Sequence, residues 1–367
     1  MYREFANAMS AIEWPSNLQI VASKNLGGAE RWAQQFAVAL AQRQAPTTVA
    51  VRAGSSVAGL PMGGLPVREL PFLTVWDPIS RHAVTRLVRE LRPDLVQTYM
   101  GRATRLAHPL GRAAHLARLG GYYKLSPYRH ADAWVGNTRR LADWMIAQGL
   151  PSAHVHHIYN FRHAAVPYPT AEIAGLRASL GIPADAWIMV ALGRFVAVKG
   201  HRFLLQGLSR LPMEIAGRPW RMLLLGDGPL QESLTQQAAD LDIERHLVWA
   251  GWQRSPGRYL QLADLVVFPS LEQEAFGNVI LDAWAWERPL LATRFFGALE
   301  VVRHGEDGWC VPCEAPRALA DGILRLLRDD ALRAELARAG ARRVREDFSE
   351  DAVMAQYLDL YRRLLRA

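Results

Sequence analysis

The stretch Leu265-Val-Val-Phe-Pro-Ser-Leu-Glu-Gln-Glu-Ala-Phe-Gly-Asn-Val-Ile-Leu-Asp282 carries the clearest structural signal in the chain. The apolar run Leu265 to Phe268 predicts a buried strand, Pro269 to Gly277 its exit loop, and Asn278 to Trp286 a helix. A strand that leads through a loop into a helix is the repeating unit of parallel α/β sheets. This segment therefore indicates an α/β protein.

The same segment places two carboxylates eight residues apart, Glu274 before the helix and Asp282 inside it. At about 1.5 Å rise per residue they lie up to roughly 12 Å apart along the helix axis. That separation suits an elongated ligand contacted at both ends, with the helix N-terminus available to a phosphate between them. An acidic loop followed by a solvated helical aspartate explains the spacing equally well, so the spacing alone leaves both interpretations open.

Short apolar runs alternate with amphipathic stretches along the rest of the chain, which indicates doubly wound parallel sheets. The other predicted elements are strands at Leu18 to Ala22, Asp94 to Thr98, Ala133 to Gly136, Trp187 to Leu192, Arg221 to Leu225, Leu247 to Ala250 and Leu290 to Thr293, and a helix at Glu30 to Gln42.

The length of 367 residues favours two domains, each with its own core. The best linker candidate is His163 to Thr170, which contains prolines and shows no periodicity. We therefore expect a Rossmann-like domain over 1–165, a second Rossmann-like domain over 166–345, and a final amphipathic helix within 346–367 that packs back across either domain. Two such domains leave a cleft between them, a usual place for ligands.

Positive charge is concentrated in the first half of the chain. Residues 1–165 contain 19 Lys and Arg against 9 Asp and Glu, whereas residues 166–367 contain 24 against 26. The basic half predicts an anionic partner, either a phosphorylated glycolipid or glycan or an acidic membrane surface. Nucleic acid is not expected, because the arginines are scattered singly and no recognition module is present. An arginine-rich composition without a specific partner is the alternative.

The hydropathy pattern bears on localisation. No apolar run approaches the roughly 18 to 20 residues of a membrane span, and Met1 to Phe5 lack the apolar core of a signal peptide. We therefore expect a cytoplasmic protein. The basic first half favours peripheral contact with the cytoplasmic face of the inner membrane.

Three patterns imitate redox or metal sites. Cys310 and Cys313 form a Cys-x-x-Cys pair, but it lies deep in the chain and no second ligand pair is evident. Asp240-Leu-Asp242 ends a predicted helix, so we interpret it as surface. A run of histidines fits a strand in which neighbouring imidazoles point to opposite faces; these are His154, His156, His157 and His163. We expect no metal site.

Loops after the predicted strands carry groups suited to phosphate. Gly193 and Arg194 follow one strand and Lys199 comes five residues later, so a guanidinium and an ammonium are available to one diphosphate. Gly27-Gly28 lies where a strand turns into a helix, and backbone N–H groups at a helix N-terminus favour an anion. Gly226-Asp-Gly228 ends another strand. Each of these glycine pairs is equally compatible with a plain tight turn.

Together these residues identify a family: the chain resembles retaining glycosyltransferases of family 4, which have the two-domain GT-B fold. The resemblance implies that the domain over 1–165 binds the acceptor and the domain over 166–345 binds the nucleotide-sugar donor. The segments that carry the resemblance are Gly27-Gly-Ala-Glu30, Ala133-Trp-Val-Gly-Asn-Thr138, His157-Ile-Tyr-Asn160, Leu192-Gly-Arg-Phe-Val-Ala-Val-Lys-Gly200, Leu225-Gly-Asp-Gly-Pro229, Ala263-Asp-Leu-Val-Val-Phe-Pro-Ser270, Glu274-Ala-Phe-Gly-Asn-Val279 and Gly297-Ala-Leu-Glu-Val-Val302. Their order and spacing extend over nearly the whole chain.

The resemblance implies transfer of a sugar from a nucleotide-diphosphate sugar, with a UDP-sugar favoured, to an acceptor hydroxyl with retention and without an obligatory metal or other cofactor. Arg194 and Lys199 would hold the diphosphate, Glu274 the sugar hydroxyls and Asp282 the ribose. The other implied donor contacts are Gly28, Gly193, Asp227, Gly228, Phe276, Gly277, Asn278 and Val279. Lipopolysaccharide core is the preferred acceptor, because such cores are often phosphorylated.

Two features depart from the family pattern. The family's second acid is usually glutamate, and Asp282 is one methylene shorter. An N-domain histidine near the sugar is common in the family, and no residue of this chain matches it clearly. Candidate acceptor contacts in that region are Tyr99, His115, Arg118 and Lys124.

Two other functions remain compatible with the same fold. A sugar-nucleotide epimerase or sucrose-type synthase would act on the donor without a glycan acceptor. A non-catalytic nucleotide-sugar-binding protein would keep the fold but tolerate loss of Glu274 and Lys199.

Overall fold

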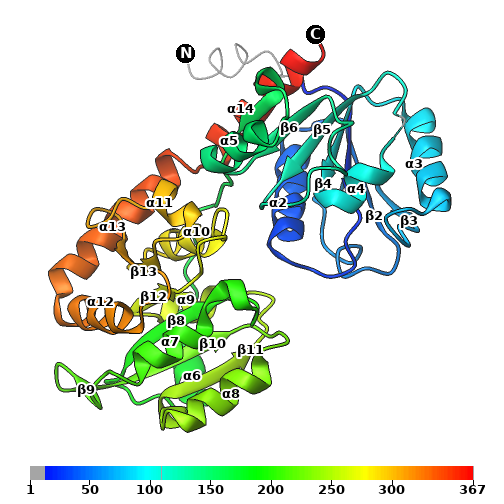
Figure 1. Cartoon of the computed structure of the whole chain (residues 1–367). Coiled ribbons are helices and arrows are strands. Elements are labelled where there is room, and N and C mark those ends of the chain that lie inside the picture. The colour runs from blue at the N-terminus through cyan, green and yellow to red at the C-terminus, as the bar shows by residue number, and fades with distance from the viewer. Residues whose placement is uncertain (1–12, 109, 367) are drawn as a thin grey trace. The chain divides into compact units, whose positions relative to one another are not determined.

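A computed structural model describes residues 13–108 and 110–366, and Met1 to Phe5 lie outside this range. By contacts the chain forms two compact units: unit 1 extends to Tyr159 and resumes at Val353, and unit 2 comprises Asn160–Ala352. The boundary expected after residue 165 lies six residues further along the chain. Figure 1 shows both units with their helices and strands labelled.

Unit 1 is built on a parallel sheet with strand order β3-β2-β1-β4-β5-β6-β7. The strands are β1 Asn17–Val21, β2 Thr47–Arg52, β3 Val67–Leu70, β4 Leu95–Tyr99, β5 Ala114–Leu119, β6 Ala133–Gly136 and β7 Val155–His157. The helices are α2 Gly28–Gln42, α3 Pro78–Leu91, α4 Met100–Leu106, α5 Arg139–Ala147, the 3-10 turn η1 Ser152–His154, and α14 Glu350–Leu364.

Unit 2 repeats the style with strand order β11-β10-β8-β12-β13-β14, all parallel, and β9 added antiparallel to β10. Its strands are β8 Trp187–Leu192, β9 Glu214–Ile215, β10 Arg218–Leu225, β11 Leu247–Gly251, β12 Leu265–Phe268, β13 Leu290–Thr293 and β14 Trp309–Val311. Its helices are α6 Thr170–Ser179, α7 His201–Leu208, α8 Gln231–Asp240, α9 Gly257–Leu262, α10 Asn278–Ala285, α11 Phe296–Val301, α12 Pro316–Arg328 and α13 Asp330–Glu346, with 3-10 turns η2 Ala197–Lys199 and η3 Glu244–His246.

The predicted strands are present, with small shifts at their ends. The strand expected at Asp94 begins at Leu95, because the Asp94 carboxylate accepts hydrogen bonds from the backbone N–H and hydroxyl of Ser16. The helix expected to reach Trp286 ends at Ala285, and Trp286 is its C-cap. The linker candidate contains neither helix nor strand before α6 begins at Thr170.

The core of unit 2 is formed by mainly apolar strands. All six residues of β8 are buried, as expected for a parallel strand covered on both faces. Helices α7 and α12 pack side by side, as do α10 and α13 (Figure 1). This packing fixes the strand ends from which the functional loops leave.

The central strands of unit 1 carry polar side chains on one face. Gln19 on β1 lies opposite Gln97 on β4 in the parallel register. The final helix supplies their partner, because the Tyr361 hydroxyl accepts a bond from Gln19 Nε2 (3.1 Å) and donates one to Gln97 Oε1 (2.8 Å). The part of α14 from Val353 onward therefore belongs to unit 1.

Candidate active site

The exit loop of β8 is locked against the exit loop of β12. Gly200 has φ 66°, and a Cβ at this position would lie 1.9 Å from the carbonyl oxygen of Pro269, so only glycine fits. The backbone N–H of Leu271 donates to the carbonyl of Val198 at 2.8 Å. These contacts hold Lys199 next to the loop Pro269 to Gly277, which contains Glu274.

Lys199 and Glu274 form an ion pair at the junction of these loops. Lys199 Nζ lies 2.7 Å from Glu274 Oε2, and the two side chains are 20% and 17% exposed. Partial burial weakens solvent screening, so this charge-assisted bond is stronger than a surface ion pair. One ammonium donor is used by Glu274, and the two others that a lysine carries suit a bound anion.

The position of Glu274 is also fixed by the chain that follows β13. The backbone N–H of Gly297 donates to the carbonyl of Glu274 (3.1 Å), and that of Phe296 donates to the carbonyl of Glu272 (3.0 Å). The loop that presents the carboxylate is therefore held by backbone bonds on both sides.

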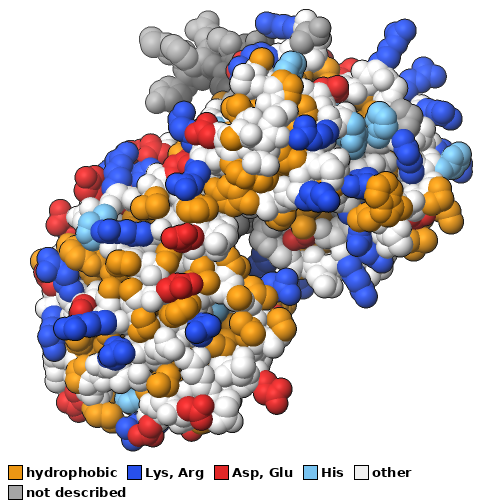
Figure 2. All heavy atoms as spheres, in the orientation of Figure 1, with side chains coloured by type: hydrophobic (Ala, Val, Ile, Leu, Met, Phe, Trp, Pro, Cys, Tyr) orange, Lys and Arg blue, Asp and Glu red, His pale blue; other side chains and the backbone are white. Residues whose placement is uncertain are grey.

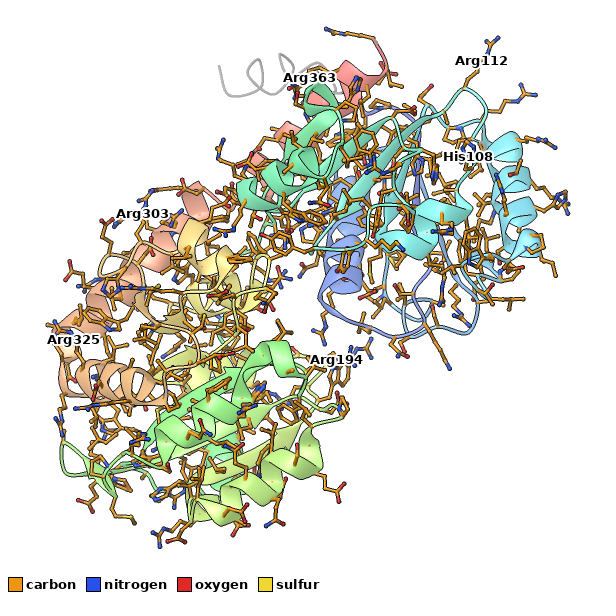
Figure 3. The ribbon with its side chains drawn as sticks, in the orientation of Figure 1. His108, Arg112, Arg194, Arg303, Arg325 and Arg363 are labelled. Atoms are coloured by element: carbon orange, nitrogen blue, oxygen red, sulfur yellow. The ribbon has the colours of Figure 1, made fainter. Side chains whose placement is uncertain are left out.

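The β10 exit loop joins the same edge of the sheet. The backbone N–H of Phe195 donates to the carbonyl of Asp227 at 2.7 Å, and the N–H of Gly193 donates to that of Leu225 at 3.0 Å. The Asp227 side chain is exposed. Arg194 is also exposed, and its side chain lies at the periphery of unit 2 in Figure 3. These bonds hold the loop with the predicted contacts Gly193 and Arg194 beside the loop with Asp227.

Helix α10 begins at the same edge and carries the second acid. Gly277 is its N-cap with φ 81°. The Phe276 side chain is buried, so only its backbone is available to a ligand. Val279 is also buried, at 9% exposure, in the first turn of the helix.

Residues just after the start of unit 2 are bonded to this helix. Asn160 Nδ2 donates to Asn278 Oδ1 at 2.7 Å, and Arg162 Nε donates to Asp282 Oδ1 at 2.7 Å. The predicted ribose acid is therefore already paired through one carboxylate oxygen. Sequence patterns gave Asn160 and Arg162 no site role, because both lie in irregular chain where no periodicity indicates a partner.

His201 is a further residue that sequence reasoning did not single out. It is the first residue of α7, directly after Gly200, and is 4% exposed. Burial, and to a lesser degree the charge of Lys199, lowers the pKa of His201 to about 3. This imidazole is therefore neutral at physiological pH and adds no positive charge to the loop.

In unit 1, two of the predicted contacts lie on exposed chain. Gly28 is the first residue of α2, next to an N-cap whose own N–H donates to the Glu30 carboxylate at 2.9 Å. Lys124 lies on the loop after β5 and is exposed. Both placements are compatible with the predicted roles, which stay predictions.

The structure corrects the expectation for the other unit 1 candidates, whose side chains face the interior. The Tyr99 hydroxyl donates to Gln19 Oε1 (2.7 Å) and accepts from Gln97 Nε2 (2.6 Å). His115 is 3% exposed, and Thr98 Oγ1 lies 3.0 Å from its Nε2. Burial lowers the pKa of His115 to about 3. We therefore do not carry Tyr99 and His115 forward as acceptor contacts.

Arg118 is likewise an interior residue. It is 2% exposed, and its guanidinium carbon lies 3.6 Å from the centroid of the Trp32 ring. A guanidinium stacked on indole is held in place by cation–π attraction. We therefore do not carry Arg118 forward as an acceptor contact either.

The Cys-x-x-Cys and Asp-x-Asp patterns lie in environments that are typical of structural and surface residues. Burial raises the pKa of Cys310 to about 12, the opposite of an activated thiol. Asp240 ends α8, and Asp242 faces Arg245 on the surface at 3.7 Å. Within residues 13–108 and 110–366, no three His, Cys, Asp or Glu side chains gather as metal ligands, and no helix is long and apolar enough to cross a bilayer.

Two parallel α/β units, with an Arg, Lys and Glu set at the carboxyl edge of the second sheet, define the GT-B class of glycosyltransferases. The chain belongs to the glycosyltransferase family that two family models describe. Residues 173–343 match the model "Glycosyl transferases group 1", and residues 26–164 match the model "Glycosyltransferase Family 4".

Two relatives from Rhizobium meliloti (strain 1021) cover almost the full chain. The lipopolysaccharide core biosynthesis glycosyltransferases LpsE and LpsD are each 32% identical, over 91% and 92% of this chain and 95% of their own length. Among solved structures, Anabaena HepE in complex with UDP and glucose has a TM-score of 0.82 at 21% identity, covering 94% of this chain and 99% of that one. WaaG, a glycosyltransferase involved in lipopolysaccharide biosynthesis, has a TM-score of 0.72 at 15% identity, covering 94% and 99%.

Proposed function

We propose that this glycosyltransferase transfers a sugar from a nucleotide-diphosphate sugar, most simply a UDP-sugar, to a hydroxyl of a cell-envelope glycan, with lipopolysaccharide core as acceptor. The observation that carries the donor assignment is the Lys199–Glu274 ion pair at the junction of two strand-end loops. The names of the relatives LpsE and LpsD support the acceptor class, and the UDP complex of HepE supports the donor class.

The diphosphate would occupy the carboxyl edge of the unit 2 sheet. Arg194 supplies a planar guanidinium fork and Lys199 a compact ammonium, and both oppose the charge that develops on the leaving phosphate. The N-terminus of α10 adds backbone N–H donors beside them. Gly28, at the N-terminus of α2 in unit 1, stays a predicted donor contact through its backbone amide.

Glu274 would accept hydrogen bonds from the hydroxyls of the donor sugar while its second contact holds Lys199. The backbone bonds from Phe296 and Gly297 to the carbonyls of Glu272 and Glu274 hold the loop that would present this carboxylate. Asp282 would meet the ribose hydroxyls with the oxygen that Arg162 does not use, directly or through a water, because its side chain is shorter than glutamate.

Transfer would proceed with retention at the anomeric carbon and without a metal ion. The leaving phosphate takes the proton of the acceptor hydroxyl on the same face of the sugar, so no side-chain general base is needed. Arg194 and Lys199 perform the charge neutralisation that a divalent ion supplies in other phosphoryl chemistry.

Product analysis tests this proposal. The enzyme is incubated with UDP-glucose, UDP-galactose and UDP-N-acetylglucosamine and with a dephosphorylated or native core oligosaccharide, and the anomeric configuration of the product is measured by NMR. We expect an α-linked product from an α-linked donor and full activity in EDTA. A β-linked product would contradict retention, and activity restored only by a divalent ion would contradict metal independence.

The same assay separates the alternatives. An epimerase or sucrose-type synthase would convert the donor without the glycan. A binding protein would release no UDP with any acceptor, yet would still show a thermal shift with UDP.

A further inference from the structure

Unit 1 displays a cluster of exposed apolar side chains where the chain enters α3. Leu73, Val75, Trp76 and Ile79 are 53%, 38%, 76% and 62% exposed. Among residues 13–108 and 110–366, these are four of ten large apolar side chains that are exposed, and they fall within seven residues. Single exposed apolar residues are ordinary, but a contiguous group marks an interaction surface.

The cluster is presented by a rigid turn. The Asp77 carboxylate caps α3 by accepting from the N–H of Ile79 (3.0 Å) and also accepts from the N–H of Leu73 (3.2 Å). The guanidinium carbon of Arg105, on α4, lies 3.9 Å from the centroid of the Trp76 ring. These contacts fix the backbone turn that carries the cluster and the position of the Trp76 ring.

Positive charge surrounds the cluster and continues along the exposed face of α3. Arg86 and Arg89 follow Ile79 at helical spacing and are exposed. Figure 2 shows blue and orange side chains intermingled over this part of unit 1. The nearby acid Glu90 is opposed by Arg68 at 3.8 Å.

The far end of α3 adds an arginine-rimmed cavity. Its volume is about 750 Å³, and Arg89, Arg92 and Arg112 line it together with the apolar Val88 and Leu110. Arg112 extends outward in Figure 3. The one acid in its lining, Asp94, is engaged by Ser16. A helix of 14 residues is about 20 Å long, so these guanidinium groups and the apolar cluster lie at opposite ends of one surface.

We infer that this α3 surface, formed by residues 73–92 with Arg105 and Arg112, docks the enzyme onto a bilayer of anionic phospholipid. Leu73, Trp76 and Ile79 enter the interfacial region, where indole and aliphatic groups are stable, and the arginines contact lipid phosphates. Charge complementarity selects this occupant, because a second copy that docked through the same surface would bring an equally basic surface against it. The inference concerns membrane contact and does not depend on the sugar or glycan that the active site uses.

Vesicle flotation of the full chain tests it, with vesicles of phosphatidylglycerol and phosphatidylcholine mixed and of phosphatidylcholine alone. We expect binding to the anionic vesicles that weakens with added salt, and little binding to the neutral ones. The double variant Trp76→Ser/Ile79→Ser should bind at least tenfold more weakly. Arg86→Gln/Arg89→Gln should bind about 30-fold more weakly, from about 1 kcal/mol per arginine near an anionic surface.

Matched variants on unit 2 provide the controls. Met213→Ser removes an apolar side chain of similar exposure, and Arg328→Gln/Arg338→Gln removes the same charge from exposed helix positions. Both should bind anionic vesicles like the parent.

Three results would overturn the inference: no flotation of the parent, equal binding to neutral vesicles, or unchanged binding of both α3 double variants. Capture of an acidic protein by the α3 surface with no lipid binding would also overturn it. Transfer to a short water-soluble acceptor should be the same in all variants, so a failed donor or acceptor assignment remains distinguishable from a failed membrane assignment.

Discussion

The two units share a parallel α/β architecture but differ in what their sheets bury. Of twenty buried polar or charged residues in the described chain, fourteen lie in unit 1 and six in unit 2. In unit 2 the buried strands are mainly apolar, and Lys199 and Glu274 lie in loops at the carboxyl edge. In unit 1 polar side chains enter the interior, where a neighbouring chain segment must satisfy them.

The polar interior of unit 1 contains a closed ring of hydrogen bonds. Gln19 donates to Tyr361, Tyr361 to Gln97, Gln97 to Tyr99, and Tyr99 back to Gln19, at 2.6 to 3.1 Å. Burial raises the pKa of both tyrosines well above that of free tyrosine, so both hydroxyls keep the protons they donate. Such a ring is worth more than its separate bonds, because each polarises the next.

Residues in the loops of unit 2 can therefore be replaced without altering its core. The interior of unit 1, by contrast, depends on α14, a helix from the far end of the chain. Substitutions should therefore separate activity from stability in unit 2 and join stability to the last helix in unit 1. Four predictions test this contrast, in order of decreasing effect.

Lys199→Met should lower kcat by about 10² to 10³-fold, as loss of one preorganised donor at a developing charge does in other enzymes. Glu274→Gln should have a similar effect, and neither should shift Tm by more than a few degrees. Steady-state kinetics and calorimetry measure the two quantities. Arg202→Ala, an exposed cation three residues away, is the matched control. Equal loss of activity and stability would indicate that the Lys199–Glu274 ion pair stabilises the fold and has no separate role in catalysis.

Tyr361→Phe should destabilise unit 1 by about 1–3 kcal/mol, because it leaves Gln97 Oε1 buried without a partner. It also removes one of the two bonds that Gln19 Nε2 donates, and the bond to Asn17 Oδ1 at 2.7 Å remains. Urea unfolding with hydrogen exchange at β1 and β4 would locate the loss. Tyr168→Phe, whose hydroxyl makes an exposed contact with Ser255 in unit 2, should cost little. Equal effects of the two substitutions would dismiss the ring as a stabilising element.

Each unit contains one deeply buried histidine whose pKa is lowered from 6.5 to about 3, His115 in unit 1 and His201 in unit 2. The unfolded chain binds these protons more readily, so their stability contribution is complete above pH 6.5 and declines as the pH falls toward 3. At pH 5 each should have cost about 2 kcal/mol. Unfolding free energies from pH 7 to 5 measure the slope, and His115→Gln and His201→Gln should each flatten it. A slope unchanged in both variants would refute this account.

Arg162→Gln and Asp282→Asn should each raise the donor KM about fivefold, corresponding to about 1 kcal/mol for a partly exposed ion pair. The double variant should lose little more than either single one, because both remove the same contact. Donor KM values across this cycle measure the coupling. Fully additive losses would indicate that Asp282 binds the donor independently of Arg162.

Sequence patterns predict the bounds of the buried strands but not the direction in which polar side chains on those strands point. The buried strands β6, β8, β12 and β13 have the predicted bounds, because short apolar runs between loop residues have few alternatives. Their places near strand ends make Tyr99 and His115 site candidates in the sequence, yet both side chains are buried in the interior of unit 1. Strand position alone does not reveal which face of a sheet a distant helix covers.

Local sequence patterns are sufficient to predict the α/β class, the alternation of strand and helix, and the presence of Arg194, Lys199 and Glu274 on strand-end loops. These features are local, because hydrophobic period and loop chemistry extend over a few residues. Three contacts become visible only in the folded chain: Lys199 pairs with Glu274, Arg162 donates to Asp282, and Tyr361 closes the ring in unit 1. Those contacts join residues 75, 120 and at least 264 positions apart, and long-range packing leaves no periodic trace in a single sequence.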